Sequence, residues 1–432
     1  MARPWTPRVS EGLLAATSSR WLYRPRDFSQ RPPPAMQKCL SVLVVLLLLG
    51  AGCAPRAVAP DQIGTSRFGR LVEGAVTESD IKGGWVRPHP GPFWWDQIEI
   101  EQDVYDWSEA DRVVTYWQER DQALLATLWP FAQWDQARCH SNESTVKHPF
   151  GDEQVWLRNV CHNESFDEWV NAVVERYDGD GADDMPGLRY GITHWEIGNE
   201  PDLQTSELSF FQSGPSAYAE VYRLAYAQIK QADPDATLLF GGMAAMHQFG
   251  RAFWEEVFTS ERERVEVFNI HSLGASDQFY AKEYHEFLVQ NGFLQPSFWI
   301  TEALVGSRFF QWDEQQKARM TLVGYAQAFA NGAARVFDVG RHDPSGGPGD
   351  LAEQTFARVV ELMDGFEKAE WIGQNSLIKF TFSDRVIFVA WDGVKLPLSV
   401  SGRVQTVRYD GVRKQMDARE VRADEPMFVI VP

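Results

Sequence analysis

The sequence is poor in basic residues relative to acidic ones. Its 432 residues include 41 Lys and Arg against 60 Asp and Glu, which gives a formal net charge of −19. Residues 1–53 carry seven basic and two acidic side chains, so the remaining residues sum to −19 − 5 = −24. A surface of this charge repels nucleic acids and anionic lipids. We therefore expect no nucleic-acid partner and favour neutral ligands.

The chain also lacks a phosphate-binding turn and a membrane-length apolar run. No early strand is followed by the Gly-rich turn that is typical of nucleotide-binding sheets, and we expect no cofactor. The apolar run Cys39–Leu49 is too short to span a bilayer comfortably. It follows Lys38 in the segment MQKCLSVLVVLLLLGAGCAP, which has the pattern of a signal peptide.

The end of this segment resembles a bacterial lipobox, with Cys53 as the residue that would be lipidated. The match is imperfect, and the alternative is an ordinary signal peptide cut elsewhere, for example after Ala59. Pro60 directly after that site argues against such a cut. We assign residues 1–59 to an N-terminal extension and a lipoprotein-type signal peptide. We expect an exported protein that contacts membranes only through a lipid anchor: a bacterial cell-envelope lipoprotein, or otherwise a secreted or periplasmic protein.

Cysteine is scarce, and two of the four cysteines, Cys39 and Cys53, belong to the signal segment. An exported chain meets an oxidising compartment, so Cys139 and Cys161 are expected to form a disulfide. A histidine follows each of them, which leaves a Cys/His metal site as the alternative. Other ligand signatures are missing nearby, and we expect no metal. The acidic run DGDGADD at 178–184 could bind Ca²⁺, but a solvated loop is the simpler interpretation.

Strand-like and helix-like segments alternate along most of the chain. The segments expected to be strands are FGRLVEG, GGWVRPHP, ALLATLWP, THWEIGNEP, ATLLFGG, VEVFNIHS, SFWITEA and ARVFDVG. Strands that are apolar throughout are buried on both faces, which implies a parallel sheet. Eight such strands with helices between them imply a (β/α)8 TIM barrel, which we place at residues 60–372. A doubly wound open sheet is the alternative, and the missing phosphate-binding turn disfavours it.

The pattern changes after Trp371. The segments LIKFTFSDRVIFVAWDG, GRVQTVRYDG and PMFVIVP have strand-like composition, with turn residues between them and no helical segments. We therefore expect a small C-terminal antiparallel β domain at residues 373–432.

Polar residues collect at the ends of the expected barrel strands, where barrels of this type carry their chemistry. Arg87 and Trp129 end the second and third strands, Asn199 and Glu200 the fourth, and His271 and Glu302 the sixth and seventh. The two glutamates are 302 − 200 = 102 residues apart, on strands that face each other across the mouth. Two carboxyl groups about 5–5.5 Å apart serve as acid/base and nucleophile in retaining glycosidases.

The segments WEIGNEPD and FWITEA resemble glycoside hydrolase clan A, whose members are retaining (β/α)8 enzymes. The segments WVRPHPGPFWWDQIEIEQDVYDWSEAD and VVERYDGDG are most similar to family 39 and related bacterial cellulase-like proteins. The resemblance covers roughly residues 83–343.

The resemblance implies a role for each matching residue. Glu200 matches the general acid/base, and Glu302 matches the nucleophile. Asn199 matches the residue that binds the sugar 2-hydroxyl, Arg87 the arginine that contacts the nucleophile, and His271 a histidine that lines the sugar site. From its place at a strand end, we add Trp129 as a candidate platform for a sugar ring, although core packing explains a single tryptophan equally well.

Two features qualify these assignments. Glu196 lies on the same strand as Glu200 but deeper, and we expect it to be an ion-paired group inside the barrel. Many members of the clan hold the nucleophile with a tyrosine on strand six, whereas NIHSLG has none until Tyr280. Either another group then holds Glu302, or Glu302 is positioned differently.

The sequence leaves three functions open. The first is a retaining β-glycosidase that hydrolyses an oligosaccharide or polysaccharide. The second is a transglycosylase that uses the same residues. The third is a carbohydrate-binding lipoprotein without turnover, which the presence of both carboxylates disfavours, because binding alone requires neither.

Overall fold

The computed structural model describes residues 62–72, 84–205, 208–273, 278–305, 312–339, 350–373 and 376–432. The predicted signal segment and the predicted lipidation site Cys53 lie outside these residues. Among the described helices, none is both long enough and apolar enough to cross a bilayer.

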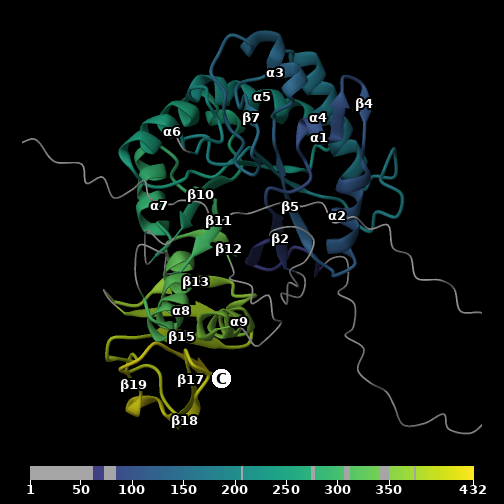
Figure 1. The fold of residues 1–432 in the computed structure, drawn as a ribbon. Coiled ribbons are helices and arrows are strands. Elements are labelled where there is room, and N and C mark those ends of the chain that lie inside the picture. The colour runs from purple at the N-terminus through teal and green to yellow at the C-terminus, as the bar shows by residue number, and fades with distance from the viewer. Residues whose placement is uncertain are drawn as a thin grey trace, which may run out of the picture.

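Eight parallel strands form the central sheet (Figure 1). Isolated bridges between Leu239 and Val267 and between Met243 and Ile270 join its two outermost strands, which closes the sheet into a barrel. The predicted (β/α)8 fold is therefore confirmed. In spatial order the strands are β10 (Phe268–Leu273), β11 (Phe298–Leu304), β12 (Ala333–Asp338), β1 (Phe68–Val72), β2 (Trp85–Pro88), β5 (Ala123–Leu128), β8 (His194–Ile197) and β9 (Thr237–Phe240).

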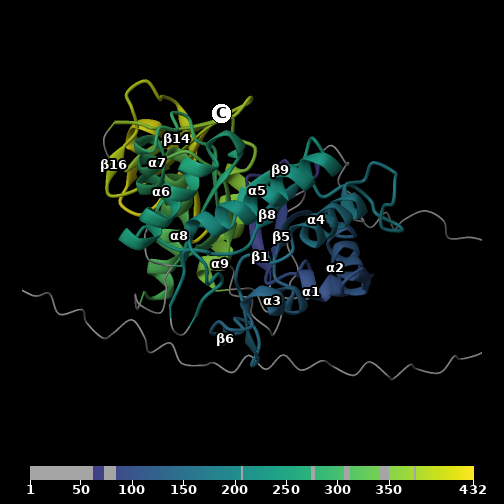
Figure 2. The same ribbon diagram turned by 90° about the horizontal axis from the view of Figure 1, so that it is seen from above.

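Helices connect the strands and lie around the sheet (Figures 1 and 2). The main ones are α2 (Ser108–Gln118), α4 (Asn163–Tyr177), α5 (Pro215–Ala232), α6 (Gln248–Ser260), α7 (Ala281–Gln290), α8 (Glu314–Ala330) and α9 (Leu351–Met363). Shorter elements extend the loops after β2 and β5: α1 (Trp95–Ile98), β3 (Glu99–Glu101), β4 (Val104–Tyr105), α3 (Gln133–His140), β6 (Val146–Lys147) and β7 (Gln154–Val155).

Burial explains why apolar runs became strands. Every residue of β5 is buried, as expected for a strand that is covered by helices on one side and by the barrel interior on the other. A cluster that includes Trp85, Leu125, Leu239, Trp299 and Phe337 fills one end of the interior. The other end, at the carboxyl ends of the strands, is polar.

The C-terminal unit is an antiparallel sheet whose order is β13-β14-β15-β20-β17-β18. One face joins the core of the barrel helices, where Phe366 packs against Phe380. The sheet begins at Lys368, before the predicted boundary at residue 373. Its strands are β13 (Lys368–Trp371), β14 (Leu377–Thr381), β15 (Val386–Ala390), β17 (Arg403–Arg408), β18 (Arg413–Asp417) and β20 (Met427–Val431).

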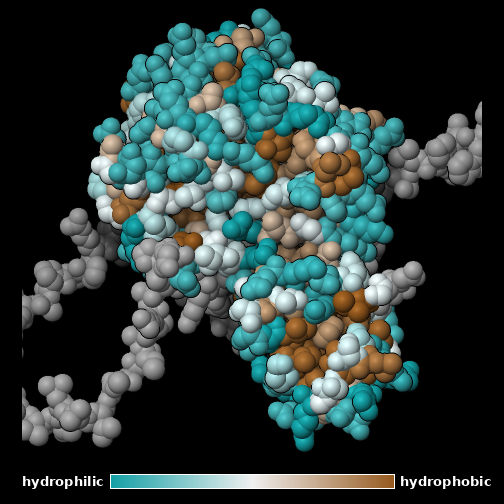
Figure 3. Space-filling model, turned by 180° about the vertical axis from the view of Figure 1, so that it is seen from behind, coloured by the Kyte–Doolittle hydropathy of each residue, from teal (hydrophilic) through white to brown (hydrophobic). Residues whose placement is uncertain are grey.

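The opposite face of this sheet packs on a second small cluster, which includes residues beside the pair β16 (Val394–Lys395) and β19 (Arg422–Ala423). Apolar residues also gather on the outside of the C-terminal unit (Figure 3). They border a groove of about 470 Å³ whose apolar lining comprises Ile372, Val386, Phe388, Pro397, Val400 and Val431.

Candidate active site

A buried ion cluster fills the polar end of the barrel interior. The fully buried Arg87 donates from Nε to Glu196 at 2.7 Å, from Nη1 to Glu302 at 2.8 Å and from Nη2 to Asn199 at 2.7 Å. Asn269 on β10 donates to the other oxygen of Glu196 at 2.6 Å. Glu196 therefore occupies the ion-paired interior position that its sequence position predicts. Because an unpaired buried charge is costly, the contacts of Arg87 and Asn269 hold these side chains in place.

Glu302 reaches the interior through a bulge in β11. Trp299 and Thr301 both point inward, so strict alternation would turn Glu302 outward. The register with β10 shifts at this point: Ile300 pairs with Ile270, and Glu302 pairs with His271, which leaves Thr301 as the extra residue. A β-bulge of this kind re-aims the next side chain. Thr301 and Glu302 therefore both face the cluster.

Glu200 reaches the same point through an unusual turn after β8. Gly198 has φ = 71°, and Glu200 has φ = 39°, which lies in the left-handed region that a glutamate rarely adopts. Such a conformation costs about 1–3 kcal/mol and concentrates at functional sites. Tyr218 supports the turn by donating to the carbonyl of Ile197 at 2.8 Å and accepting from the amide of Gly241 at 2.8 Å.

His271 bridges the two glutamates. Its Nδ1 lies 2.9 Å from Glu200 Oε1 and 3.5 Å from Glu302 Oε1, while its Nε2 lies 2.9 Å from the hydroxyl of Thr301. Arg87 and His271 together therefore take the positioning role for which strand six supplies no tyrosine. Thr301 in turn donates to Asn269 at 2.8 Å, which connects His271 to the buried cluster.

The electrostatics distinguish the two glutamates. Burial raises the pKa of Glu200 to about 7. Burial also raises the pKa of Glu302, but the guanidinium of Arg87 beside it acts in the opposite direction. Arg87 donates to Glu302 and not to Glu200, so Glu302 is the carboxyl that ionises first. Burial lowers the pKa of His271, which is therefore neutral near pH 7.

The described residues contain three groups with the spacing of metal ligands. In the first, Cys139 and Cys161 are joined in the expected disulfide and cannot bind a metal as thiolates. In the second, residues 178–184, the side chains of Asp178, Asp180 and Asp184 accept from backbone amides of their own loop. The third is Glu200 with His271 and Glu302, where the guanidinium of Arg87 already supplies a positive charge.

The structure brings together five of the six predicted site residues. Asn199 and Glu200 lie just after β8, and they join Arg87, His271 and Glu302 in one hydrogen-bonded group. The sixth, Trp129, is fully buried and stacks on Trp94 with ring centroids 4.5 Å apart. Its indole donates to the carbonyl of Pro90 at 2.6 Å. Its role as a sugar platform stays a prediction, and the side chains of Phe150 and Phe210 lie over it.

Three site residues were not anticipated from the sequence. His89 lies 3.3 Å from Arg87 through its Nδ1, and Asn269 and Thr301 complete the cluster below the glutamates. Each lies two positions along the chain from a residue inside the barrel. His89 follows Arg87, Asn269 precedes His271, and Thr301 follows Trp299. Extending the period-two pattern along these strands would have found them.

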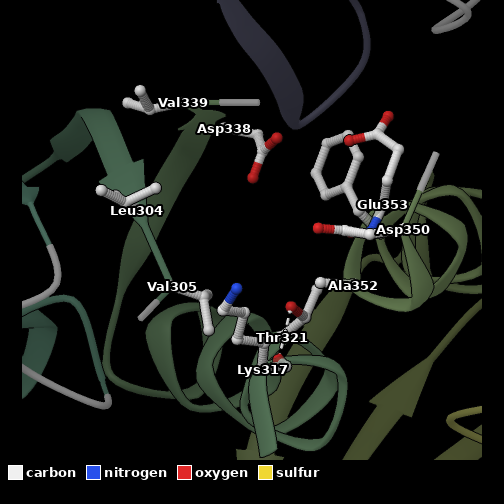
Figure 4. A pocket seen from close by; sticks show the side chains of 10 residues that line it. Leu304, Val305, Lys317, Thr321, Asp338, Val339, Asp350, Ala352 and Glu353 are labelled. Carbon is white, nitrogen blue, oxygen red and sulfur yellow. Dashed lines mark hydrogen bonds between the residues drawn. The ribbon is translucent and has the colours of Figure 1, made fainter. Parts of the chain in front are cut away.

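Another group of carboxylates lies outside the barrel, at the end of β12 (Figure 4). Asp338 accepts from Tyr325 on α8 at 2.8 Å, and it shares a pocket with Asp350, Glu353 and Lys317. This pocket has a volume of about 40 Å³, which suffices for a few water molecules and not for a sugar ring. Its carboxylates are therefore separate from Glu200 and Glu302.

Comparisons with known proteins show what this chain resembles. No family model matches it, and a search of curated proteins finds no match. Among solved structures, a family 39 glycoside hydrolase from Bacteroides cellulosilyticus is similar, with a TM-score of 0.56 and 15% identity over 85% of this chain and 81% of the other.

Two further structures are also similar. A family 39 β-xylosidase from Caulobacter crescentus has a TM-score of 0.56 and 14% identity, over 87% of this chain and 98% of that one. A glucosidase from Croceicoccus marinus has a TM-score of 0.51 and 11% identity, over 80% and 89%. At these identities the likeness demonstrates a shared fold.

Proposed function

We propose that the chain is a retaining β-glycosidase that hydrolyses O-glycosidic bonds by double displacement. One observation carries the proposal: a carboxylate oxygen of Glu200, one of Glu302 and a ring nitrogen of His271 all lie within 4.8 Å of one another. This spacing fits a retaining pair, for which the two carboxyls lie about 5–5.5 Å apart. Inverting enzymes need about 6.5–9.5 Å to admit a water molecule between them.

Glu200 is suited to be the acid. Three interior carboxyls, Glu196, Glu200 and Glu302, share the single guanidinium of Arg87, so one of them is best kept protonated. Glu200 is the one that Arg87 does not contact, and burial raises its pKa to about 7. Its proton has a ready acceptor in Nδ1 of the neutral His271, whose Nε2 donates to Thr301. A protonated carboxyl poised near neutral pH can protonate the leaving oxygen.

Glu302 is suited to be the nucleophile. Its contact with Arg87 at 2.8 Å favours the ionised form, and its side chain stays 9% exposed at the mouth. Attack on the anomeric carbon forms a glycosyl ester and removes the negative charge of Glu302. Loss of that charge lowers the pKa of Glu200, which then acts as the base that activates water for the second step. Asn199, held by Arg87, is placed to bind the sugar 2-hydroxyl.

The acidic surface and the names of the structural relatives suggest the substrate class. The chain carries a formal charge of −19, which favours a neutral saccharide. Proteins of the same fold include a β-xylosidase and a glucosidase, and we propose a β-linked oligosaccharide or polysaccharide. The signal-like segment before residue 60 supports export and attachment to the cell envelope through a lipid on Cys53.

The test uses the purified protein, a panel of aryl β-glycosides and NMR of the product anomer. The wild type should retain configuration. Glu302→Ala should lose turnover and recover it with azide, which gives an inverted glycosyl azide. Glu200→Ala should act only on substrates with good leaving groups.

Asp338→Asn is the control, because this carboxyl also ends a barrel strand but faces the helices. Full activity in Glu302→Ala would disprove the nucleophile assignment. Sugar binding without turnover in the wild type would indicate a carbohydrate-binding protein instead.

A further inference from the structure

The segment between β5 and α4 folds back over the catalytic group. It contains α3 and a hairpin that we call the flap, residues 146–155, built from β6, a turn and β7. In the turn, His148 accepts from the amide of Phe150 at 3.1 Å and donates its own amide to Glu153 at 2.9 Å. These bonds fix the position of Phe150 at the tip.

The tip of the flap reaches the site through His89. The rings of Phe150 and His89 lie 5.1 Å apart in an edge-to-face contact. His89 Nδ1 is 3.3 Å from Arg87, which in turn binds Glu302. Phe150 is therefore separated from the catalytic group by one imidazole ring.

The same tip covers the aromatic residues that could have formed an open platform. Phe150 lies 5.6 Å from Trp129 and 5.9 Å from Phe210, and His148 lies 5.0 Å from Trp94. Trp94 and Trp129 are accordingly buried, and Glu200 and Glu302 are only 5% and 7% exposed. A saccharide could not extend across Trp129 while the flap holds this position.

The base of the flap is held by hydrogen bonds of partly buried groups and of one buried carboxylate. The side chain of Gln133 donates to the carbonyl of Trp156 at 3.0 Å and accepts its amide at 3.1 Å. The fully buried Asp135 accepts the amides of Cys161 and His162 at 2.9 and 3.0 Å.

The disulfide between Cys139 and Cys161 encloses the flap within a 22-residue separation. The covalent link and the hydrogen bonds to the buried Asp135 hold both ends of this segment, so the flap is a fixed wall of the site.

We infer that the flap closes the sugar site on the side of β2, β5 and β8, so that Phe150 contacts the terminal ring and the enzyme acts on chain ends. This inference rests on the proposed function and specifies its substrate as the end of a saccharide chain. Aromatic rings are suited to such contact because they offer a large apolar face at little entropic cost.

The experiment compares the wild type, Phe150→Ala and Asp152→Asn on an aryl β-glycoside and on the matching oligosaccharide ladder. Asp152 is the matched control, since it lies on the same turn with a side chain that is 88% exposed. The wild type and Asp152→Asn should release one short product from the earliest time points. Phe150→Ala should raise KM for the aryl glycoside about tenfold with kcat nearly unchanged, because the ring binds sugar without contacting the reacting atoms. It should also yield products of mixed length.

A double variant, Cys139→Ser with Cys161→Ser, should shift KM and product length in the same direction, with its melting temperature as the check on folding. Mixed-length products from the wild type, or identical behaviour of Phe150→Ala and Asp152→Asn, would overturn the inference and leave the proposed function standing.

If the wild type turns nothing over, the proposed function fails, and oligosaccharide binding to Glu302→Gln, followed by tryptophan fluorescence, decides the inference. Weaker binding after adding Phe150→Ala supports the flap as the wall of the site. Binding that Phe150→Ala leaves unchanged, or the absence of binding in both proteins, rejects the inference about the flap.

Discussion

Replacing Arg87 with lysine should move the acidic limb of the pH–rate profile to higher pH. Arg87 is fully buried and gives Glu302 a charged hydrogen bond of 2.8 Å while also binding Glu196 and Asn199. A lysine carries one compact ammonium group and cannot match three partners in this fork geometry. The ionised form of Glu302 then loses its closest donor.

The size of the shift follows from that hydrogen bond. A hydrogen bond to a charged group contributes about 1.5–3 kcal/mol, and each pKa unit corresponds to about 1.4 kcal/mol. We therefore expect the pKa of Glu302 to rise by about 1–2 units. The nucleophile must be ionised to attack, so the acidic limb of kcat/KM moves upward by the same amount.

The assay is kcat/KM for an activated aryl β-glycoside between about pH 4 and 9, where both limbs are visible. Arg70→Lys is the control, because Arg70 pairs with Asp338 and Glu353 outside the barrel. The acidic limb of the pH–rate profile of Arg70→Lys should stay where it is in the wild type. An unshifted limb in a folded Arg87→Lys protein would refute the assignment of Glu302 as the group held by Arg87.

Two further predictions concern Glu200 and Thr301. Burial raises the pKa of Glu200 from its ordinary 4.5 to about 7, so the folded state binds this proton more tightly than the unfolded chain. Stability is then lost as pH rises from about 4.5 to 7, by roughly 3 kcal/mol in total. Glu200→Gln should be more stable to urea than the wild type at pH 8 and as stable as the wild type near pH 4. Equal stability of the two proteins at both pH values would contradict a raised pKa of the buried Glu200 carboxyl. Thr301→Val removes the hydroxyl that contacts His271, Asn269 and Glu196, and should cost about 1–3 kcal/mol in urea unfolding. Without that acceptor the proton of His271 shifts to Nδ1 and donates to ionised Glu200, so the alkaline limb should move to lower pH. A limb that stays in place would show that His271 does not set the protonation of Glu200.

Much of the architecture follows from local patterns in the sequence. The run ALLATL has no polar face, and a short strand of this kind is stable only when it is buried on both sides, as β5 is. Eight such segments predict the barrel, and Asn199-Glu200-Pro201 directly after one of them predicts where the acid lies.

The partner of the acid is less well determined by local pattern. Trp299 and Thr301 face the barrel interior, so simple alternation turns Glu302 toward the helices. The bulge at Thr301 reverses this, and it exists because β11 must pair with β10 on both sides of the extra residue. Pairing between strands is a property of the assembled sheet and leaves no distinct local signal.

For the aromatic side chains, too, the sequence indicates the position along the chain, and the tertiary structure decides the surroundings. Trp129 was a candidate sugar platform because of its place at a strand end. It lies there as predicted, yet it is fully buried beneath a hairpin whose tip is 21 residues further along the chain. Which ring faces the substrate depends on how that hairpin folds back. Residue type alone cannot specify this, since the same tryptophan serves equally well in a core.

The sequence by itself therefore determined the barrel, the antiparallel C-terminal sheet and the strands that carry the two glutamates, because burial and turn preferences act over a few neighbouring residues. The tertiary structure alone decided that Glu302 turns inward at a bulge and that Glu200 sits in a left-handed turn. It also decided that His271 joins the two and that Phe150 packs against His89 near them. These features arise from contacts between segments tens to hundreds of residues apart, and such contacts form only once the barrel closes.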